Sequence, residues 1–327
     1  MKHYPLVVLT DSPFPNLEPT REALSSISAE LRVLPVASED SIIEASRDAD
    51  AVLVTYAKIT ARAIEQMKRC RVISRFGIGV DNVDVEAATR QGIRVTRIPD
   101  YCLDEVSDHT LALLLALARK IPFANSMVHN GRWDLSATAP IHRLRGSVLG
   151  LLGFGRISRL VAQKAAAFGM RVIATDPYAS AESIDRAGVE RVDFEQLLSL
   201  SDYVSIHSPL LPETRHLFSA AAFHRMKNSA YLINTARGPI VDETALVKAL
   251  EEGQIAGAAL DVLSQEPPSD SRLSRRDDVI LTPHMSFYSI ESLAELQKRA
   301  AEEVVYALTG RPTNNAVSPE ALNDTPK

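Results

Sequence analysis

Residues 148–158 have the sequence VLGLLGFGRIS, and residues 171–176 have the sequence RVIATD. The first stretch is an apolar run that ends in Gly153-Phe154-Gly155 and is followed by a helix-like segment from about Arg156. The second run is apolar and β-branched, and it ends in Asp176, 21 positions after Gly155. A strand, a glycine turn, a helix and a distant acidic residue form the fingerprint of a dinucleotide-binding unit. The two stretches therefore predict a Rossmann-type α/β domain.

The chemistry of this fingerprint predicts the cofactor. Gly153 and Gly155 let the backbone turn and approach a pyrophosphate, whose charge is met by the N-terminus of the following helix. The third fingerprint position, where a glycine packs helix against strand, is Ser158, and a residue this small should be tolerated. A carboxylate at Asp176 accepts hydrogen bonds from a ribose 2′-hydroxyl and repels a 2′-phosphate, so NAD is predicted rather than NADP. A glycine pair alone is a weak signal, and the distant acid strengthens it.

Length and composition are typical of a globular protein with more than one domain. The chain has 327 residues, 46% of them hydrophobic and 24% charged, which predicts two domains with a core each. A formal net charge of −5 gives no electrostatic footprint for nucleic acid, so no such partner is expected. The apolar stretch Leu6–Leu9 is too short for a signal peptide, and Leu111–Ala118 is far shorter than a membrane span. No membrane partner is expected.

The cysteines and histidines predict neither a disulfide framework nor a metal site. Cys70 and Cys102 are too few for such a framework and lack metal-ligand spacing, which favours a reducing compartment and a cytoplasmic protein. His129, His142, His216 and His224 show no recognisable metal-ligand spacing either, so no metal is predicted.

The rest of the chain alternates strand-like and helix-like segments, which predicts doubly wound parallel sheets. The expected strands are Leu6–Leu9, Ala51–Thr55, Val72–Ser74, Tyr203–Ile206, Ala230–Asn234, Ala256–Asp261 and Val279–Thr282. The expected helices are Arg21–Glu30, Ala61–Lys68, a buried Leu111–Lys120, Thr244–Glu251 and a final one over about Ser289–Leu308. Asn130–Gly146, with Trp133, is expected to be a loop-rich subunit-contact arm, and the tail Asn314–Lys327 to be loosely ordered.

Three polar residues follow three of these strands and are candidates for one catalytic crevice. Arg237 follows the strand at 230–234, Glu266 the strand at 256–261, and His284 the strand at 279–282. Ligands of open α/β sheets bind at the carboxyl ends of the strands. Reduction of a carbonyl by a nicotinamide needs a positioned acid such as histidine, a carboxylate to stabilise its imidazolium, and a cation for a substrate carboxylate. Each residue alone also fits a solvated loop, a turn or a strand end.

Two further segments are candidates for binding. His207 follows the strand at 203–206 and is predicted to face the cofactor, although it also fits a residue that closes a loop. The segment RFGIGVDN at 75–82 follows a first-domain strand, so Arg75 and the backbone near Gly77 and Gly79 are candidates for an anionic substrate. The alternative is a plain turn in which Asp81 and Asn82 cap the next helix.

Taken together, these motifs resemble the D-isomer-specific 2-hydroxyacid dehydrogenases over essentially the whole chain. The shared pattern is SRFGIGVDNVD, GLLGFGRIS with Asp176, HSPLLPET, NTARGPIVDE, AALDVLSQEP and TPH, in this order. The resemblance implies two Rossmann-like domains, with the NAD-binding domain at 101–287 inserted into a substrate-binding domain made of 1–100 and 288–327. It also implies a homodimer formed through the Trp133 arm.

The resemblance assigns roles to individual residues. It implies that Arg237 binds substrate, that His284 is the acid/base and that Glu266 is its paired carboxylate. The predicted cofactor contacts are Ile78, Thr110, Gly153, Gly155, Arg156, Ile157, Asp176, His207, Ser208, Thr235, Ala236, Arg237, Asp261 and His284. The predicted substrate contacts are Arg75, Gly77, Ile78, Gly79, Arg237 and Phe287.

Within that family the chain is similar to the C-terminal-binding-protein branch through PDYCLDEVSDHT and PHMSFYSIES, and to phosphoglycerate dehydrogenases through the first-domain loop and TARG. Phe287 replaces the tryptophan of the corepressors of the first branch. The leading hypothesis is an NAD-dependent oxidoreductase that interconverts a small 2-keto acid and its D-2-hydroxy acid. The alternatives are an NAD(H)-sensing interaction protein, or a family enzyme with another substrate such as phosphoglycerate, phosphite or formate.

Overall fold

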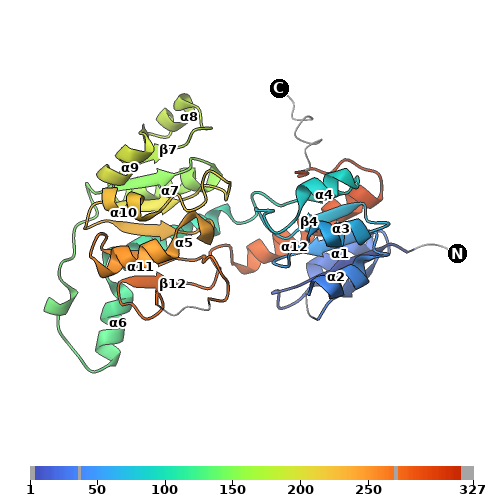
Figure 1. Cartoon of the computed structure of the whole chain (residues 1–327), viewed down its shortest axis with the longest axis horizontal. Helices are drawn as coiled ribbons and strands as arrows, with labels where there is room; N and C mark the ends of the chain where they lie inside the picture. The colour runs from blue at the N-terminus through green and yellow to red at the C-terminus, as the bar shows by residue number, and fades with distance from the viewer. Residues whose placement is uncertain (1–3, 36–37, 269–271, 318–327) are drawn as a thin grey trace. The chain divides into compact units, whose positions relative to one another are not determined.

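The computed structural model describes residues 4–35, 38–268 and 272–317, and the chain forms two compact units (Figure 1). The terminal unit comprises Met1–Tyr101 with Ser289–Lys327, and the central unit comprises Cys102–Tyr288. Both predicted boundaries, after residues 100 and 287, lie one residue before those of the units. In Figure 1 the red helix α12 lies among blue N-terminal elements, so the two ends of the chain share a unit.

The terminal unit contains a five-stranded parallel sheet with the order β2-β1-β3-β4-β5. Helices α2, α3 and α4 bury apolar residues against one face, while α12 packs against α1 and contacts β3, β4 and β5. Its strands are β1 (Leu6–Leu9), β2 (Glu30–Val33), β3 (Ala51–Val54), β4 (Val72–Arg75) and β5 (Arg94–Thr96). Its helices are α1 (Glu18–Ser25), α2 (Glu39–Ser46), α3 (Ala61–Gln66), α4 (Val85–Arg90) and α12 (Ile290–Leu308).

The central unit contains a seven-stranded parallel sheet with the order β12-β11-β10-β9-β6-β7-β8, so the strand order reverses between β6 and β9. Its strands are β6 (Val148–Leu152), β7 (Arg171–Thr175), β8 (Glu190–Arg191), β9 (Tyr203–Ile206), β10 (Tyr231–Asn234), β11 (Gly257–Leu260) and β12 (Val279–Leu281). Its helices are α5 (Leu103–Ala118), α6 (Ile121–His129), η1 (Ser136–Thr138), α7 (Arg156–Ala167), α8 (Ala181–Asp185), α9 (Phe194–Leu200), α10 (Ala220–Arg225), η2 (Gly238–Ile240) and α11 (Glu243–Glu251).

Both faces of the central sheet are covered, which explains why its inner strands, such as β6, are largely apolar rather than alternating. Leu149 and Leu151 of β6 pack in a cluster with α5 and α7. Leu152 packs in a second cluster with α9, α10 and α11. The expected fold of two doubly wound parallel sheets is confirmed by this topology.

Three predicted elements differ from the structure. Helix α5 begins at Leu103, whereas the prediction began it at Leu111. The first two turns were missed because they are mostly polar and contain no apolar run. Helix α1 covers 18–25 rather than 21–30, since Glu30 already begins β2. The segment 314–317 is not loose, because Ala316 pairs with Thr96 of β5. The remainder of the predicted loose tail, 318–327, lies outside the described residues.

Helices α5 and α6 join at Lys120, whose left-handed backbone turns the chain. Within the described ranges no single helix is long and apolar enough to cross a membrane. Among the described residues, the pair α5 and α6 is the only one that passes this test of length and composition, when its two helices are taken together with a 60° bend between them.

Candidate active site

The predicted site residues of the central unit lie along the carboxyl ends of its parallel strands. Ligands of open α/β sheets bind at this edge, near the point where the strand order reverses. Gly153 and Gly155 follow β6, Asp176 follows β7, His207 and Ser208 follow β9, Thr235, Ala236 and Arg237 follow β10, Asp261 and Glu266 follow β11, and His284 and Phe287 follow β12. Arg156 and Ile157 begin α7, and Thr110 lies on α5. The fold therefore brings residues from six strands to one edge.

The two fingerprint glycines meet different requirements. Gly153 has φ +88°, and a Cβ there would lie 2.9 Å from the carbonyl oxygen of His207. The close approach of the loops after β6 and β9 thus requires glycine for the fold itself. A Cβ built on Gly155, at the N-cap of α7, would lie more than 4 Å from every heavy atom of the described residues other than its chain neighbours. The protein leaves open space at Gly155.

Ser158 and Asp176 hold the fingerprint turn in place. The buried Ser158 hydroxyl donates a hydrogen bond to the carbonyl of Gly153 at 2.7 Å. Where the usual fingerprint has a glycine, this chain thus has a side chain that closes the turn. The Asp176 carboxylate accepts hydrogen bonds from the backbone N–H groups of Phe154 at 2.7 Å, Tyr178 at 2.7 Å and Ala179 at 3.1 Å. These bonds fix the carboxylate at the end of β7.

The loop after β10 is shaped by its own polar groups. The side chain of Asn234 accepts a hydrogen bond from the Ala236 N–H at 3.0 Å and donates one to the Arg237 carbonyl at 2.9 Å. Thr235 and Thr110 have hydroxyl oxygens 3.0 Å apart, and since Thr110 donates to the Val106 carbonyl, Thr235 donates to Thr110. Two predicted cofactor contacts from different elements are thereby joined.

A series of contacts joins the Arg237 loop to His284. Gly238 packs so closely on the next loop that a Cβ there would lie 2.0 Å from the carbonyl carbon of Leu263. The backbone N–H of Leu263 donates to Glu266 Oε1 at 2.9 Å. The other oxygen, Oε2, lies 2.6 Å from Nδ1 of His284. The predicted pair of Glu266 and His284 is therefore formed in the structure, next to the Arg237 turn.

Asp261 organises the backbone around His284. Its carboxylate is buried and accepts hydrogen bonds from the N–H groups of Met285 and Ser286, each at 2.9 Å. Its carbonyl accepts from the N–H of His284 at 2.8 Å. These bonds hold His284 at φ +51°, a left-handed conformation that costs a residue other than glycine about 1–2 kcal/mol. Phe287 lies edge-on to the His284 ring, with centroids 6.2 Å apart.

His207 is a neutral hydrogen-bonding group in this site. Its Nε2 lies 2.9 Å from the hydroxyl of buried Ser205, and burial lowers the pKa of His207 to about 4. A ring that is neutral near pH 7 is suited to hold a polar ligand and unsuited to supply a proton. This favours His284 over His207 as the acid/base.

The residues around the fingerprint fit a dinucleotide. A pyrophosphate fits the open space at Gly155 and the N-terminus of the twelve-residue helix α7. A ribose fits the fixed carboxylate of Asp176. In the terminal unit, Arg75, Gly77, Ile78 and Gly79 lie at and after the end of β4, where the side chain of Arg75 packs against Gly77. Their predicted contacts with substrate and cofactor stay predictions.

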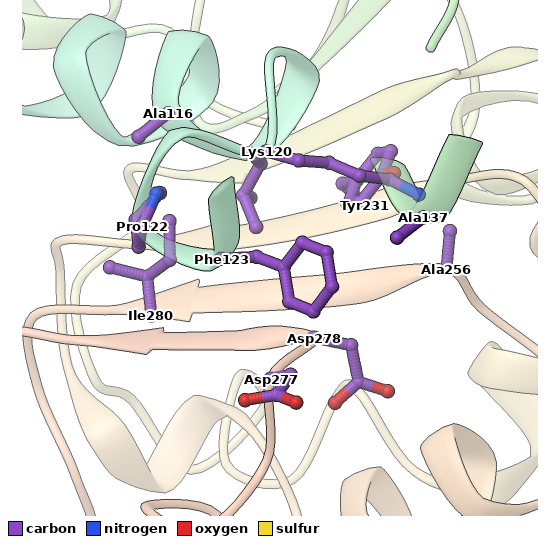
Figure 2. A pocket seen from close by; sticks show the side chains of 11 residues that line it. Ala116, Lys120, Pro122, Phe123, Ala137, Tyr231, Ala256, Asp277, Asp278 and Ile280 are labelled. Atoms are coloured by element: carbon purple, nitrogen blue, oxygen red, sulfur yellow. The ribbon is translucent and has the colours of Figure 1, made fainter. Parts of the chain in front are cut away.

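A separate pocket lies at the opposite edge of the central sheet (Figure 2). It encloses about 200 Å³ between Phe123 of α6, Lys120 and the amino ends of the last strands, marked by Tyr231, Asp278 and Ile280. Because open α/β sheets bind ligands at their carboxyl edge, this pocket is not a candidate for the cofactor.

Comparison with known proteins agrees with this geometry. Residues 111–286 match the family model described as the NAD-binding domain of D-isomer-specific 2-hydroxyacid dehydrogenases. The chain is 39% identical to a D-3-phosphoglycerate dehydrogenase of Methanocaldococcus jannaschii over 92% of its own length and 58% of that protein. It is 37% identical to a glyoxylate reductase of Thermococcus litoralis, over 87% of the chain and 88% of that protein.

A solved structure of similar fold is the D-lactate dehydrogenase of Aquifex aeolicus complexed with NAD and lactic acid. Its TM-score is 0.87 and its sequence identity 28%, over 96% of this chain and 99% of that one. The expected resemblance to the family, and to its phosphoglycerate dehydrogenases, is confirmed. The chain spans only a little over half the length of several phosphoglycerate dehydrogenases that it matches.

Proposed function

The chain belongs to the D-isomer-specific 2-hydroxyacid dehydrogenase family, and we propose that it interconverts a small 2-keto acid and its D-2-hydroxy acid with NAD as cofactor. The observation that supports this most is the contact between Glu266 and His284, 2.6 Å, at the sheet edge that also holds the dinucleotide fingerprint. An imidazole with a paired carboxylate, beside a cofactor site, is the arrangement that carbonyl reduction requires.

In this proposal the fingerprint binds the cofactor. The N-terminus of α7 and the backbone at Gly155 take the pyrophosphate, and the Asp176 carboxylate takes the adenosine ribose. The bound cofactor supplies or accepts a hydride at its nicotinamide ring. Thr110 and Thr235, whose hydroxyl oxygens lie 3.0 Å apart, are proposed to contact the cofactor at the same edge.

His284 exchanges the proton. Glu266 holds its Nδ1, so Nε2 is the atom proposed to donate a proton to the carbonyl oxygen during reduction and to take it back during oxidation. The carboxylate stabilises the imidazolium that forms in the oxidative direction. Arg237, whose loop follows β10 at the same sheet edge, two strands from β12, is proposed to bind the substrate carboxylate through two parallel hydrogen bonds. Phe287, edge-on to His284, contacts the substrate side chain.

The substrate is found by measuring NADH oxidation with glyoxylate, hydroxypyruvate, pyruvate, phenylpyruvate and phosphohydroxypyruvate, and NAD reduction with phosphite and formate. We expect turnover with at least one 2-keto acid. In Arg237→Lys, which keeps the charge and loses the paired hydrogen bonds, KM for that acid rises about tenfold or more. NADH-dependent capture of a protein partner, with no turnover on the whole panel, would instead support an NAD(H)-sensing protein.

We further propose a homodimer formed through the segment that follows α5. Every residue of α6 keeps part of its surface exposed, and Trp133 and Leu135 beyond it are 90% and 87% exposed. Large apolar side chains gathered on one segment mark an interaction surface. Sedimentation of the wild type should give a dimer, and Trp133→Asp with Leu135→Asp should give a monomer. A monomeric wild type contradicts the proposal.

A reducing compartment such as the cytoplasm is proposed on separate grounds. The sequence has only two cysteines, Cys70 and Cys102, and both are buried. Burial raises the pKa of the Cys70 thiol to about 12. So low a cysteine content is typical of compartments in which disulfides are rare.

A further inference from the structure

A second histidine lies beside the loop that holds His284. His109 is on α5, and its Nε2 is 3.1 Å from the hydroxyl oxygen of Thr282. Thr282 directly follows β12 and precedes His284 by two residues. The His109 side chain is 19% exposed, so most of its ring lies within the protein.

The chemistry of the three groups fixes the direction of their hydrogen bonds. The Thr282 hydroxyl lies 2.6 Å from Asp261 Oδ1, and an ionised carboxylate can only accept, so the hydroxyl donates to Asp261. A hydroxyl has one proton, and the Thr282 oxygen must therefore accept from His109. Nε2 of His109 thus bears a proton, and the order of donation is His109 to Thr282 to Asp261.

This series continues into the backbone of His284. The same carboxylate accepts from the N–H groups of Met285 and Ser286, and the Asp261 carbonyl accepts from the N–H of His284. The bonds therefore hold both sides of a residue whose left-handed conformation is costly by itself. If the N–H donor of His109 is removed, the Thr282 oxygen loses the hydrogen bond from His109. The Thr282 hydroxyl, which donates to Asp261, is then held less firmly.

We propose that His109 is a positioning residue for His284, acting through Thr282 and Asp261. The inference rests on the proposed acid/base role of His284. His109 touches neither substrate nor cofactor in this account. Its donor aligns the His284 loop, so its loss lowers the rate of the chemical step and leaves cofactor binding unchanged.

Matched variants separate the donor from the packing of the ring. His109→Gln places an amide N–H near the position of Nε2, whereas His109→Phe keeps a ring and removes the donor. Thr282→Ser and Thr282→Val form a matched pair at the next residue of the series, since serine keeps the hydroxyl that donates to Asp261 and valine removes it. Each is made in the full chain and assayed with NADH and the 2-keto acid that the wild type reduces best.

We expect His109→Phe and Thr282→Val each to lower kcat about three- to tenfold, the value of one hydrogen bond. His109→Gln and Thr282→Ser should stay within about twofold of the wild type, with the Kd for NADH unchanged in all four. The kcat of the double variant His109→Phe with Thr282→Val should be no lower than that of the poorer single variant, since both substitutions break the same series of hydrogen bonds. Equal loss in His109→Phe and His109→Gln, or multiplied losses in the double variant, would overturn the proposal.

A second readout does not depend on turnover. Hydrogen exchange of the Met285 and Ser286 amides should become severalfold faster in His109→Phe than in His109→Gln, because Asp261 holds both amides. Equal exchange in the two variants would refute the positioning role. If the wild type turns over nothing on the panel, the proposed function fails alone, and the exchange comparison still decides whether His109 holds the loop.

Discussion

Gly153→Ala and Gly155→Ala, two positions apart in the fingerprint, should fail in different ways. At Gly153 an added methyl meets the backbone of His207 and Ser208 at 2.9–3.1 Å, in a backbone conformation with φ +88°. The left-handed conformation alone costs alanine about 1–2 kcal/mol, and the contacts add to it, so we expect a loss of about 2 kcal/mol or more. In a domain of this size that lowers Tm by about 5 °C or more.

At Gly155 the same methyl group enters open space, and φ −81° suits alanine. Losing glycine at an N-cap costs under about 1 kcal/mol, and the reduced freedom of the unfolded chain returns a similar amount. Stability should therefore hardly change. The methyl group lies where the pyrophosphate must approach the backbone, and losing one charge-assisted hydrogen bond there weakens NADH binding about tenfold or more.

The assay pairs thermal unfolding of the cofactor-free protein with titration of NADH by fluorescence. We expect Gly153→Ala to lower Tm and Gly155→Ala to raise the Kd for NADH with Tm unchanged. Wild-type NADH affinity in Gly155→Ala would refute the assignment of the open space to the pyrophosphate. Equal losses of Tm in both variants would refute the distinction between the two glycines.

Three further predictions concern single side chains of the same edge. Ser158→Ala removes a buried hydrogen bond to Gly153 and should cost about 1 kcal/mol of stability, seen as a lower Tm; an unchanged Tm contradicts this. Burial lowers the pKa of His207 to about 4 from the ordinary 6.5, so the unfolded chain binds its proton first and stability falls as the pH drops through that window. Glutamine does not titrate, so the free energy of unfolding of His207→Gln should fall by about 1 kcal/mol less than that of the wild type between about pH 7 and about pH 5, a value reduced because part of His207 is exposed. Denaturant unfolding at the two pH values measures this difference, and an equal fall in both proteins would contradict the prediction. Glu266→Gln should lower kcat about 10- to 100-fold at unchanged Kd for NADH, since a charge-assisted bond to His284 is lost, and a kcat near that of the wild type speaks against the pair.

The buried strands were the part of the fold that the sequence predicted best. Strands β6, β7 and β9 are covered on both faces, so most of their residues are apolar and their bounds follow from the sequence. Strand β8, with the sequence ER, lies at a sheet edge and has no apolar residue, so nothing in its local pattern distinguishes it from a loop. Strand β2, with the sequence ELRV, lies at an edge of the other sheet and was missed although its polar and apolar residues alternate, because its first residue was assigned to the preceding helix.

The candidate site shows the same division. Arg237, Glu266 and His284 can be found from the sequence because parallel strands bring the loops at their carboxyl ends to one edge of the sheet. His109 was missed, because a helix brings it to Thr282 from outside the sheet and no spacing in the sequence relates residues 109 and 282. Its neighbour Thr110, a predicted cofactor contact, was the one available signal that this turn of α5 faces the site.

His284 is proposed to exchange a proton during NADH-dependent reduction of a 2-keto acid. The most direct test is kcat for His284→Ala with the acid that the wild type reduces best, alongside the Kd for NADH of both proteins. Removing the acid/base should lower kcat about 10²- to 10⁴-fold while NADH binds as it does to the wild type. Turnover by His284→Ala within a few fold of the wild type would contradict the account.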